Sequence, residues 1–344
     1  MNMKKVIFQA LALALALALA LPLGAAAQTQ RVVITAGGDV LLGGSKAKKT
    51  DVYFESFIDQ YGDGYVFKNY LPLFSSDDIT IVNLEGPLKI SSRMRKPSKS
   101  VHMYGKPKYA RILKAGSIEV ANIVNNHIDD YNTRGATREI LAEQGIIRSD
   151  SKFSVKNNSV LVRGVRVGFI GYQTPCSLET IRKGVRKVKS ACDVAVVSFH
   201  FGEVPQHTSQ IRQSQIRAAH AAIDAGADLV LGHHPHVVSG IELYKDRYVF
   251  YDLGSVQSSG KHFRYHNMVA RITLEVDTQT GKITCLPPVI YPGFTSGAGR
   301  TGLNNCQPVL YTPDDPGYET VFGIIDEASS HKKITPGPYK RGIL

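Results

Sequence analysis

Short apolar runs, each about as long as one β-strand, recur along the chain between polar segments. Runs that are rich in Val and Ile and bounded by Gly, Pro or polar residues are typical of buried strands. Residues 159–163 and 166–170 have the pattern of an antiparallel pair that turns at Gly164. Further strands are expected over residues 31–39, 78–85, 118–124, 193–199, 229–231, 247–251 and 268–276.

Helical patterns separate several of these runs. In residues 209–225, for example, the apolar residues Ile211, Ile216, Ala219 and Ile223 fall on one helical face. The pattern predicts helices over residues 53–73 (with a connecting turn), 109–115, 134–144 and 209–225. We interpret residues 89–108 as a loop or lid and residues 182–189 as a basic segment of no assigned structure.

The order of the elements indicates an α/β fold, because strands and helices alternate over most of the chain. From residue 287 onward Gly and Pro become frequent. We therefore expect one domain over residues 31–300, followed by a loop-rich tail over residues 301–344 that packs against it. The last ten residues of that tail are expected to be mobile.

The first 27 residues have the three parts of a secretory signal peptide. Two lysines, Lys4 and Lys5, precede an apolar run over residues 6–23, and small residues lead to Ala27. We expect cleavage after Ala27 and a mature protein that is periplasmic or extracellular, with at most peripheral membrane association. An uncleaved anchor is the alternative, since the apolar run approaches the length that spans a bilayer.

Composition adds a basic surplus to this picture. The 344 residues are 43% hydrophobic and 20% charged, which is ordinary for a globular protein, and their net charge is +12. Removal of the signal leaves 39 basic and 29 acidic residues. This surplus favours anionic polymers or phospholipid surfaces as partners. Nucleic acid is not expected, because the basic residues are dispersed and the protein is expected to be exported.

The four cysteines fit no Cys-x-x-Cys metal pattern. In an oxidising compartment they can form disulfides, and the pairing of sequence neighbours joins Cys176 to Cys192 and Cys285 to Cys306. Four free buried thiols are an equally good interpretation.

Residues that can bind a metal follow several of the predicted strands. Three imidazoles, His233, His234 and His236, come directly after the strand at residues 229–231. Because ligands of open α/β sheets bind at the carboxyl ends of strands, we expect the groups at these ends to converge. The mixture of carboxylates and imidazoles suits one or two ions of Mn²⁺, Fe²⁺ or Zn²⁺. The groups at these ends are Asp39, Asn83 or Glu85, Asn126 or His127, His200, and His234 with His236.

Other polar residues have two interpretations each. Strand-like alternation places His233 on the side opposite His234 and His236, so we interpret it as structural. Glu203 is a candidate substrate-site residue that orients a ligand histidine, a role that Asp129 and Asp130 can also fill. The basic cluster Arg93, Arg95, Lys96 and Lys99 is either a solvated loop or, beside a metal site, a place where Arg93 and Arg95 bind a polyanion.

A series of short motifs resembles the bacterial capsule-synthesis protein family, CapA, over roughly residues 31–256. The family is similar to the calcineurin-like metallophosphoesterases, so the resemblance implies a four-layer α/β/β/α sandwich with a metal site at one edge. The ligands that it implies are Asp39, Glu85, Asn126, His200, His234 and His236. It also implies that His127 is the general acid and that the protein helps to make or export poly-γ-glutamate or a related capsule. The motifs are Gly38-Asp39, Asn83-Leu-Glu85-Gly-Pro87, Asn125-Asn-His127, His200-Phe-Gly-Glu203, Gly232-His-His-Pro-His236 and Tyr251-Asp-Leu-Gly-Ser255.

Three functions are consistent with these residues. The first is an exported, metal-binding capsule-synthesis protein that acts on an anionic polymer and works with synthase subunits. If it hydrolyses its substrate, a metal-activated water is the nucleophile and His127 protonates the leaving group. The second is a periplasmic phosphoesterase, which is disfavoured because Leu41 stands where such enzymes have a histidine two residues after the first aspartate. The third is a non-catalytic protein that binds the polymer or a synthase subunit.

Overall fold

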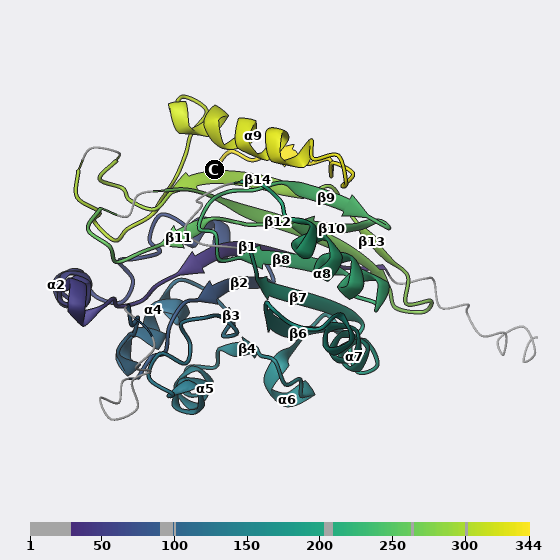
Figure 1. Cartoon of the computed structure of the whole chain (residues 1–344), viewed down its shortest axis with the longest axis horizontal. Helices are drawn as coiled ribbons and strands as arrows, with labels where there is room; N and C mark the ends of the chain where they lie inside the picture. Colours follow the sequence, from purple (N-terminus) through teal and green to yellow (C-terminus); the bar gives the residue numbers. More distant parts are fainter. Residues whose placement is uncertain (1–28, 90–98, 100, 203–208, 263–264, 300–301) are drawn as a thin grey trace, which may run out of the picture.

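Two β-sheets contain the strands of the part of the chain that the structure describes. The structure is a computed structural model, and it describes residues 29–89, 99, 101–202, 209–262, 265–299 and 302–344. The two sheets face each other across a shared apolar cluster, and Figure 1 shows the helices arranged around them.

The larger sheet follows the order β15-β14-β12-β1-β2-β3-β4. Its strands β1 to β4 are parallel, whereas β12 runs antiparallel to β1 over most of the length of β1. The strands are β1 (Thr29–Val40), β2 (Ile79–Leu84), β3 (Val120–Asn122), β4 (Ile147–Ser149), β11 (Ser255–Gln257), β12 (His266–Asp277), β13 (Ile283–Cys285), β14 (Val289–Phe294), β15 (Val309–Leu310) and β16 (Lys340–Arg341).

The smaller sheet follows the order β5-β6-β7-β8-β10-β9. Its four central strands are parallel, and the two edge strands pair antiparallel with their neighbours. The predicted antiparallel pair at residues 159–170 is therefore confirmed, at the edge of this sheet. The strands are β5 (Ser159–Val162), β6 (Val165–Gln173), β7 (Val194–His200), β8 (Leu229–His233), β9 (Ile241–Tyr244) and β10 (Arg247–Phe250).

Three apolar clusters define the layers. One lies between the sheets and includes Ile34 and Leu231, one from each sheet. A second packs the outer face of the larger sheet against α2 to α5, and a third packs the smaller sheet against α7 and α8. The predicted α/β/β/α sandwich is thus confirmed. The helices are α2 (Thr50–Tyr61), α3 (Leu71–Phe74), α4 (Ala110–Ala115), α5 (Arg134–Glu143), α6 (Val155–Asn158), α7 (Leu178–Lys189), α8 (Gln213–Asp224) and α9 (Pro316–Ser329), with short 3-10 turns η1 (Lys46–Lys48) and η3 (Pro107–Tyr109).

The C-terminal segment differs from the expected loop-rich tail over residues 301–344. Helix α9 occupies 14 of its residues and packs against β14, β12 and β9, as its place above β14 in Figure 1 shows. Val321, Phe322 and Ile325 of this helix are fully buried and belong to the cluster between the sheets. The final residues are also held, because β16 pairs with β14. Asp315 followed by Pro316 is a helix-start signal that the frequency of Gly and Pro concealed.

The basic segment at residues 182–189 forms the last eight of the twelve residues of helix α7. Ile181, Val185 and Val188 are buried at a spacing of four and three residues, and Ser177 caps the helix by accepting a hydrogen bond from the backbone N–H of Thr180. The narrow apolar stripe among many charges explains why composition alone did not indicate a helix.

Some expectations about cellular compartment concern residues outside the described part. The predicted signal peptide and its cleavage site at Ala27 lie there. Among the described residues, each helix is too short or too polar to cross a bilayer. All four cysteines are free thiols, with Cys192 and Cys306 buried, so the free-thiol interpretation matches this structure.

Candidate metal centre

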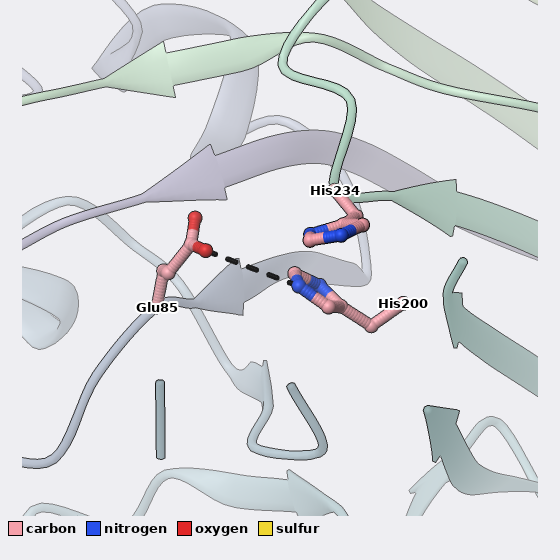
Figure 2. Close-up of side chains that lie close together, drawn as sticks. All are labelled: Glu85, His200 and His234. Atoms are coloured by element: carbon pink, nitrogen blue, oxygen red, sulfur yellow. Dashed lines mark ion pairs between the residues drawn. The ribbon is translucent and has the colours of Figure 1, made fainter. Parts of the chain in front are cut away.

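The parallel strands of both sheets bring polar side chains to one edge of the sandwich. Asp39 lies near the carboxyl end of β1, and Glu85 follows β2 directly. His200 ends β7 and is in register with His233, which ends β8. Figure 2 shows Glu85 reaching towards the rings of His200 and His234 from the opposite side of the site. The predicted convergence of strand ends therefore occurs.

Close backbone packing fixes the position of Asp39. Its N–H donates to the carbonyl of Gly254 at 2.9 Å. A Cβ atom at Gly38 would lie only 1.8 Å from that same carbonyl oxygen, so a side chain there would push the two segments apart. Glycine before the aspartate is thus a condition for bringing β1 against the loop before β11.

Asp39 is held by hydrogen bonds on both of its oxygens. Asn83 donates from Nδ2 to Oδ1 at 2.7 Å, and Nδ1 of His236 lies 2.8 Å from Oδ2. Ser255 adds a contact between its hydroxyl and Nδ1 of His236 at 3.2 Å. The carboxylate is therefore buried and oriented before any ligand arrives.

Two groups of three side chains have ligand atoms within 4.8 Å of one another. The first group is Glu85, His200 and His234, and the second is Asp39, Glu85 and His236. Glu85 is common to both, with its two oxygens 3.9 Å from Nε2 of His200 and 3.8 Å from Nδ1 of His236. A carboxylate shared in this way can bridge two neighbouring cations.

The protonation states fit a divalent cation. Burial lowers the pKa of His234 to about 4 and holds the pKa of His200 well below its usual value, so both rings are neutral and able to bind a metal. Burial alone would lower the pKa of His236, but Glu85 and Asp39 raise it to about 10. Without an ion, the imidazolium of His236 is thus the cation that faces the two buried carboxylates. A divalent ion would take over this role, and the ring of His236 would give up its proton to bind it. Burial, together with the charge of Asp39, raises the pKa of Glu85. The ionised form of this carboxylate is therefore disfavoured while no further cation is bound.

Asn126 and His127 are adjacent in sequence but have different partners. Asn126 Oδ1 lies 2.9 Å from Nε2 of His200, which places its amide at the edge of the first group. His127 instead contacts Asp130, with 2.7 Å between Nδ1 and Oδ2. Lys99 donates to the other oxygen of Asp130 at 2.6 Å, and the backbone N–H of Met103 donates to Oδ2 at 2.8 Å. Asp130 is therefore the residue that orients His127.

His233 is in neither ligand group, but the strand-like alternation on which we based its structural role does not hold for this segment. Its Nδ1 lies 3.8 Å from Oδ1 of Asp39, and the residue is completely buried. The segment is not extended, because His234 and His236 have positive φ angles of 111° and 63°. Neither ring nitrogen of His233 has a hydrogen-bond partner within the described residues. Only the crowding of three histidines in four residues hinted at this placement.

Asp252 is a further buried carboxylate that the sequence did not single out. It is 1% exposed, and burial together with the charge of Asp39 holds its pKa well above the usual value. Oδ1 accepts from the N–H of Gly254, whereas Oδ2 has no partner in the described part of the chain. Its place within the motif ending at Ser255 was the available signal.

Several predicted residues lie outside this description. Arg93, Arg95 and Glu203, which we expected at the substrate site, are outside the described residues, as is Lys96. Lys99 of the same basic cluster is described, and it also donates to the backbone oxygen of Asn126 at 2.5 Å. Leu41, which stands at the position of the missing histidine, lines a cavity beside Asp39 and Glu85.

Two mixed sheets between helices, with a carboxylate- and histidine-rich site at the strand ends, define an α/β sandwich protein with a candidate divalent-metal centre. The sequence model of the family described as "Bacterial capsule synthesis protein PGA_cap" matches residues 33–259. The chain therefore belongs to this bacterial capsule-synthesis family.

Individual relatives agree with that assignment. The chain is 28% identical over 256 residues to the capsule biosynthesis protein CapA of Bacillus anthracis, which covers 66% of this chain and 60% of the relative. It is 28% identical over 244 residues to the PGA biosynthesis protein CapA of Bacillus subtilis (strain 168), covering 63% and 61%. The matches thus span about three fifths of each relative's length.

A solved structure from Staphylococcus aureus, assigned there as a 5'-nucleotidase in complex with alpha-ketoglutarate, aligns with a TM-score of 0.40 and 12% identity. That alignment covers 86% of this chain and 58% of the other.

Proposed function

We propose that this protein is an exported capsule-synthesis factor that binds one or two divalent ions and hydrolyses or processes an anionic polymer of the poly-γ-glutamate class. The observation that carries the proposal is the pair of ligand groups that share Glu85. The names of the two relatives, which refer to capsule and PGA biosynthesis, support the choice of polymer.

The donor set supports manganese, iron or zinc over calcium, because three of the five candidate ligands are imidazoles. When bound, such an ion polarises a substrate oxygen and activates water. Asp39, Glu85, His200, His234 and His236 would hold it, with the amide of Asn126 beside His200.

The chain's own acid is His127. Its Nδ1 faces Asp130, which leaves Nε2 for the transfer of a proton to the departing group. Lys99 neutralises the other oxygen of Asp130 and ties the dyad to the backbone of Asn126. This arrangement fixes the ring of His127 beside the cavity that Asp39 and Glu85 also line.

The net charge of the proposed mature protein supports a polyanion as the substrate. It has 39 basic and 29 acidic residues, and this surplus attracts polymers of repeated carboxylates over distances set by the ionic strength. Synthase subunits that deliver such a polymer are the protein partners that we propose, and the periplasm or the cell exterior is the proposed location.

The test is an assay of the purified mature protein with Mn²⁺ or Zn²⁺ on oligomers of γ-linked glutamate and, in parallel, on bis(4-nitrophenyl) phosphate. We expect metal-dependent cleavage of the glutamate oligomer and its loss in His127→Ala. Cleavage of the phosphodiester alone would replace the proposal with a phosphoesterase. Metal-independent polymer binding without cleavage of either would indicate a non-catalytic role.

A further inference from the structure

A small cavity opens directly beside the candidate metal centre. Its volume is about 140 Å³, and Asp39, Glu85, His127 and His236 line one part of it. Pockets for whole small ligands are usually larger, roughly 300–1,000 Å³. The cavity therefore suits a short segment of a longer substrate that continues outside it.

The rest of the lining includes a buried carboxamide. Gln257 is only 1% exposed, and within the described residues neither its Oε1 nor its Nε2 has a hydrogen-bond partner. The hydroxyl of Ser259, which also lines the cavity and is fully buried, has no partner there either. Most buried polar groups in proteins are paired, because leaving a donor or an acceptor unpaired is costly. Because both residues line the cavity, a ligand that enters it is one source of the partners that these groups lack.

The strand β11 explains why Gln257 belongs to this site. Ser255 contacts His236, and Val256 is buried in the apolar cluster on the outer face of the larger sheet. Ser255 pairs with Asp39 of β1 and Gln257 pairs with Val40, with a shift of register between these two pairs. Ser255 and Gln257 both line the cavity. The carboxamide is thus carried by the sheet itself, which gives it a defined position relative to Asp39.

The unpaired groups restrict the chemistry of the ligand. A carboxamide both donates and accepts, and a serine hydroxyl does the same. A phosphate diester or a carboxylate only accepts, so it would leave Oε1 of Gln257 unpaired. A chain of amides offers both N–H and C=O groups and can satisfy both atoms. Leu41 adds an apolar wall that suits methylene groups, and the exposed ammonium of Lys48 lies at the same cavity.

We propose that this cavity is a substrate subsite for an amide-linked anionic chain, in which Gln257 and Ser259 bind the amide and Lys48 attracts a carboxylate. The inference rests on the proposed function, because it identifies the linkage that is presented to the same centre. Gln257 is a specificity residue in this account and takes no part in bond cleavage.

The experiment compares two probes that differ by one group. The first is the γ-linked trimer of glutamate, and the second is its analogue with each amide N–H replaced by an ester oxygen. Calorimetric titration of the mature protein, with and without Mn²⁺, is expected to show that the ester analogue binds about tenfold more weakly, as expected when a buried acceptor loses its donor. Gln257→Leu is expected to weaken binding of the trimer about tenfold and to remove this discrimination.

Control variants separate the subsite from the metal centre. Gln60→Leu makes the same change on the exposed face of α2 and is expected to leave both affinities unchanged. Ser259→Ala is a second probe of the cavity and is also expected to weaken trimer binding. It decides the question if Gln257→Leu does not fold. Equal binding of both probes by the wild-type protein, or full discrimination in Gln257→Leu, would overturn the subsite. If the wild-type protein does not bind Mn²⁺, this would instead contradict the proposed function. The titrations without Mn²⁺ would still show whether the subsite exists.

Discussion

Buried carboxylates lie at both ends of the parallel strands, but their surroundings differ. Asp228, just before β8, is 2% exposed and accepts hydrogen bonds from Lys189 at 2.8 Å, the backbone N–H of Ala195 at 2.9 Å and Arg247 at 3.2 Å. Two permanent cations therefore compensate one carboxylate. At this end of the sheet, the buried carboxylate therefore has a structural role.

At the opposite end the compensation is incomplete. Asp39 and Glu85 share one protonated imidazole, that of His236, and Asp252 lies close enough to raise the charge repulsion further. Burial is similar at both ends, so the number of available cations is what differs. A buried carboxylate therefore indicates a ligand site only where the protein itself does not neutralise its charge.

The largest effect is expected from Glu85→Gln. Because Glu85 belongs to both ligand groups, its loss should weaken Mn²⁺ binding by more than about 100-fold, beyond the range seen for residues that only support a ligand. Calorimetric titration with Mn²⁺ measures this. Glu119→Gln, at the other end of the strands where Glu119 accepts from the N–H of Thr80, is the matched control and should bind Mn²⁺ normally. Equal affinities of the two variants would remove Glu85 from the centre.

A second test concerns the dyad beside the metal centre. Asp130→Asn should lower kcat on the γ-linked oligomer by about 100-fold, because His127 loses the carboxylate that orients it. KM and Mn²⁺ affinity should change little, and steady-state kinetics with a parallel metal titration separate these quantities. A rise in KM with unchanged kcat would show that Asp130 shapes the binding site and does not serve His127.

Asp228→Ala tests the compensated end. Lys189 and Arg247 would lose their common partner, and the free energy of unfolding should fall by about 2 kcal/mol, less than for a fully buried pair because both cations are partly exposed. Denaturant unfolding measures the loss, and Mn²⁺ affinity should remain that of the wild type. A weakened metal site in this variant would mean that the two ends are not independent.

The last test concerns the pH dependence of the stability of the metal-free protein. Since the pKa of His236 is raised to about 10 from an ordinary value of 6.5, its pairing stabilises the fold fully below pH 6.5. That contribution is lost as the pH rises through 10, by at most about 1.4 kcal/mol per pH unit. Thermal melts in chelator between pH 7 and pH 10 measure the slope. His236→Gln should flatten it, and an unchanged slope in that variant would assign the effect to another group.

At acid pH, the stability of the metal-free protein is expected to change in the opposite direction, through Asp39. Burial alone would raise the pKa of Asp39, but its hydrogen bond with His236 and the charges of the neighbouring histidines hold that pKa below its ordinary value of 3.8. Its stabilising contribution is therefore present above that value and is lost in acid.

Much of the centre could be predicted from sequence because it depends on strand ends. Asp39 and His200 follow apolar runs whose direction in the sheet is fixed, so their convergence needed no knowledge of loops. His233 could not be placed in the same way, because the backbone of the next residues leaves the extended conformation. The unpaired carboxamide of Gln257 was also out of reach, since pairing is a property of three-dimensional neighbours.

Some helices could likewise be predicted from the sequence, and others could not. The apolar face of α8 was visible from spacing alone, whereas the stripe of α7 was hidden among lysines and arginines. Helix α9 was concealed by a composition rich in Gly and Pro, although the burial of Phe322 makes it part of the core between the sheets.

The most direct test of the metal centre is an anomalous difference map from crystals of the mature protein soaked in Mn²⁺. We predict a peak within about 2.0–2.3 Å of an oxygen of Glu85 and ring nitrogens of His200 and His234, the usual range for ions of this class. A saturating soak that leaves these side chains without a peak, while the crystal still diffracts, would contradict the account.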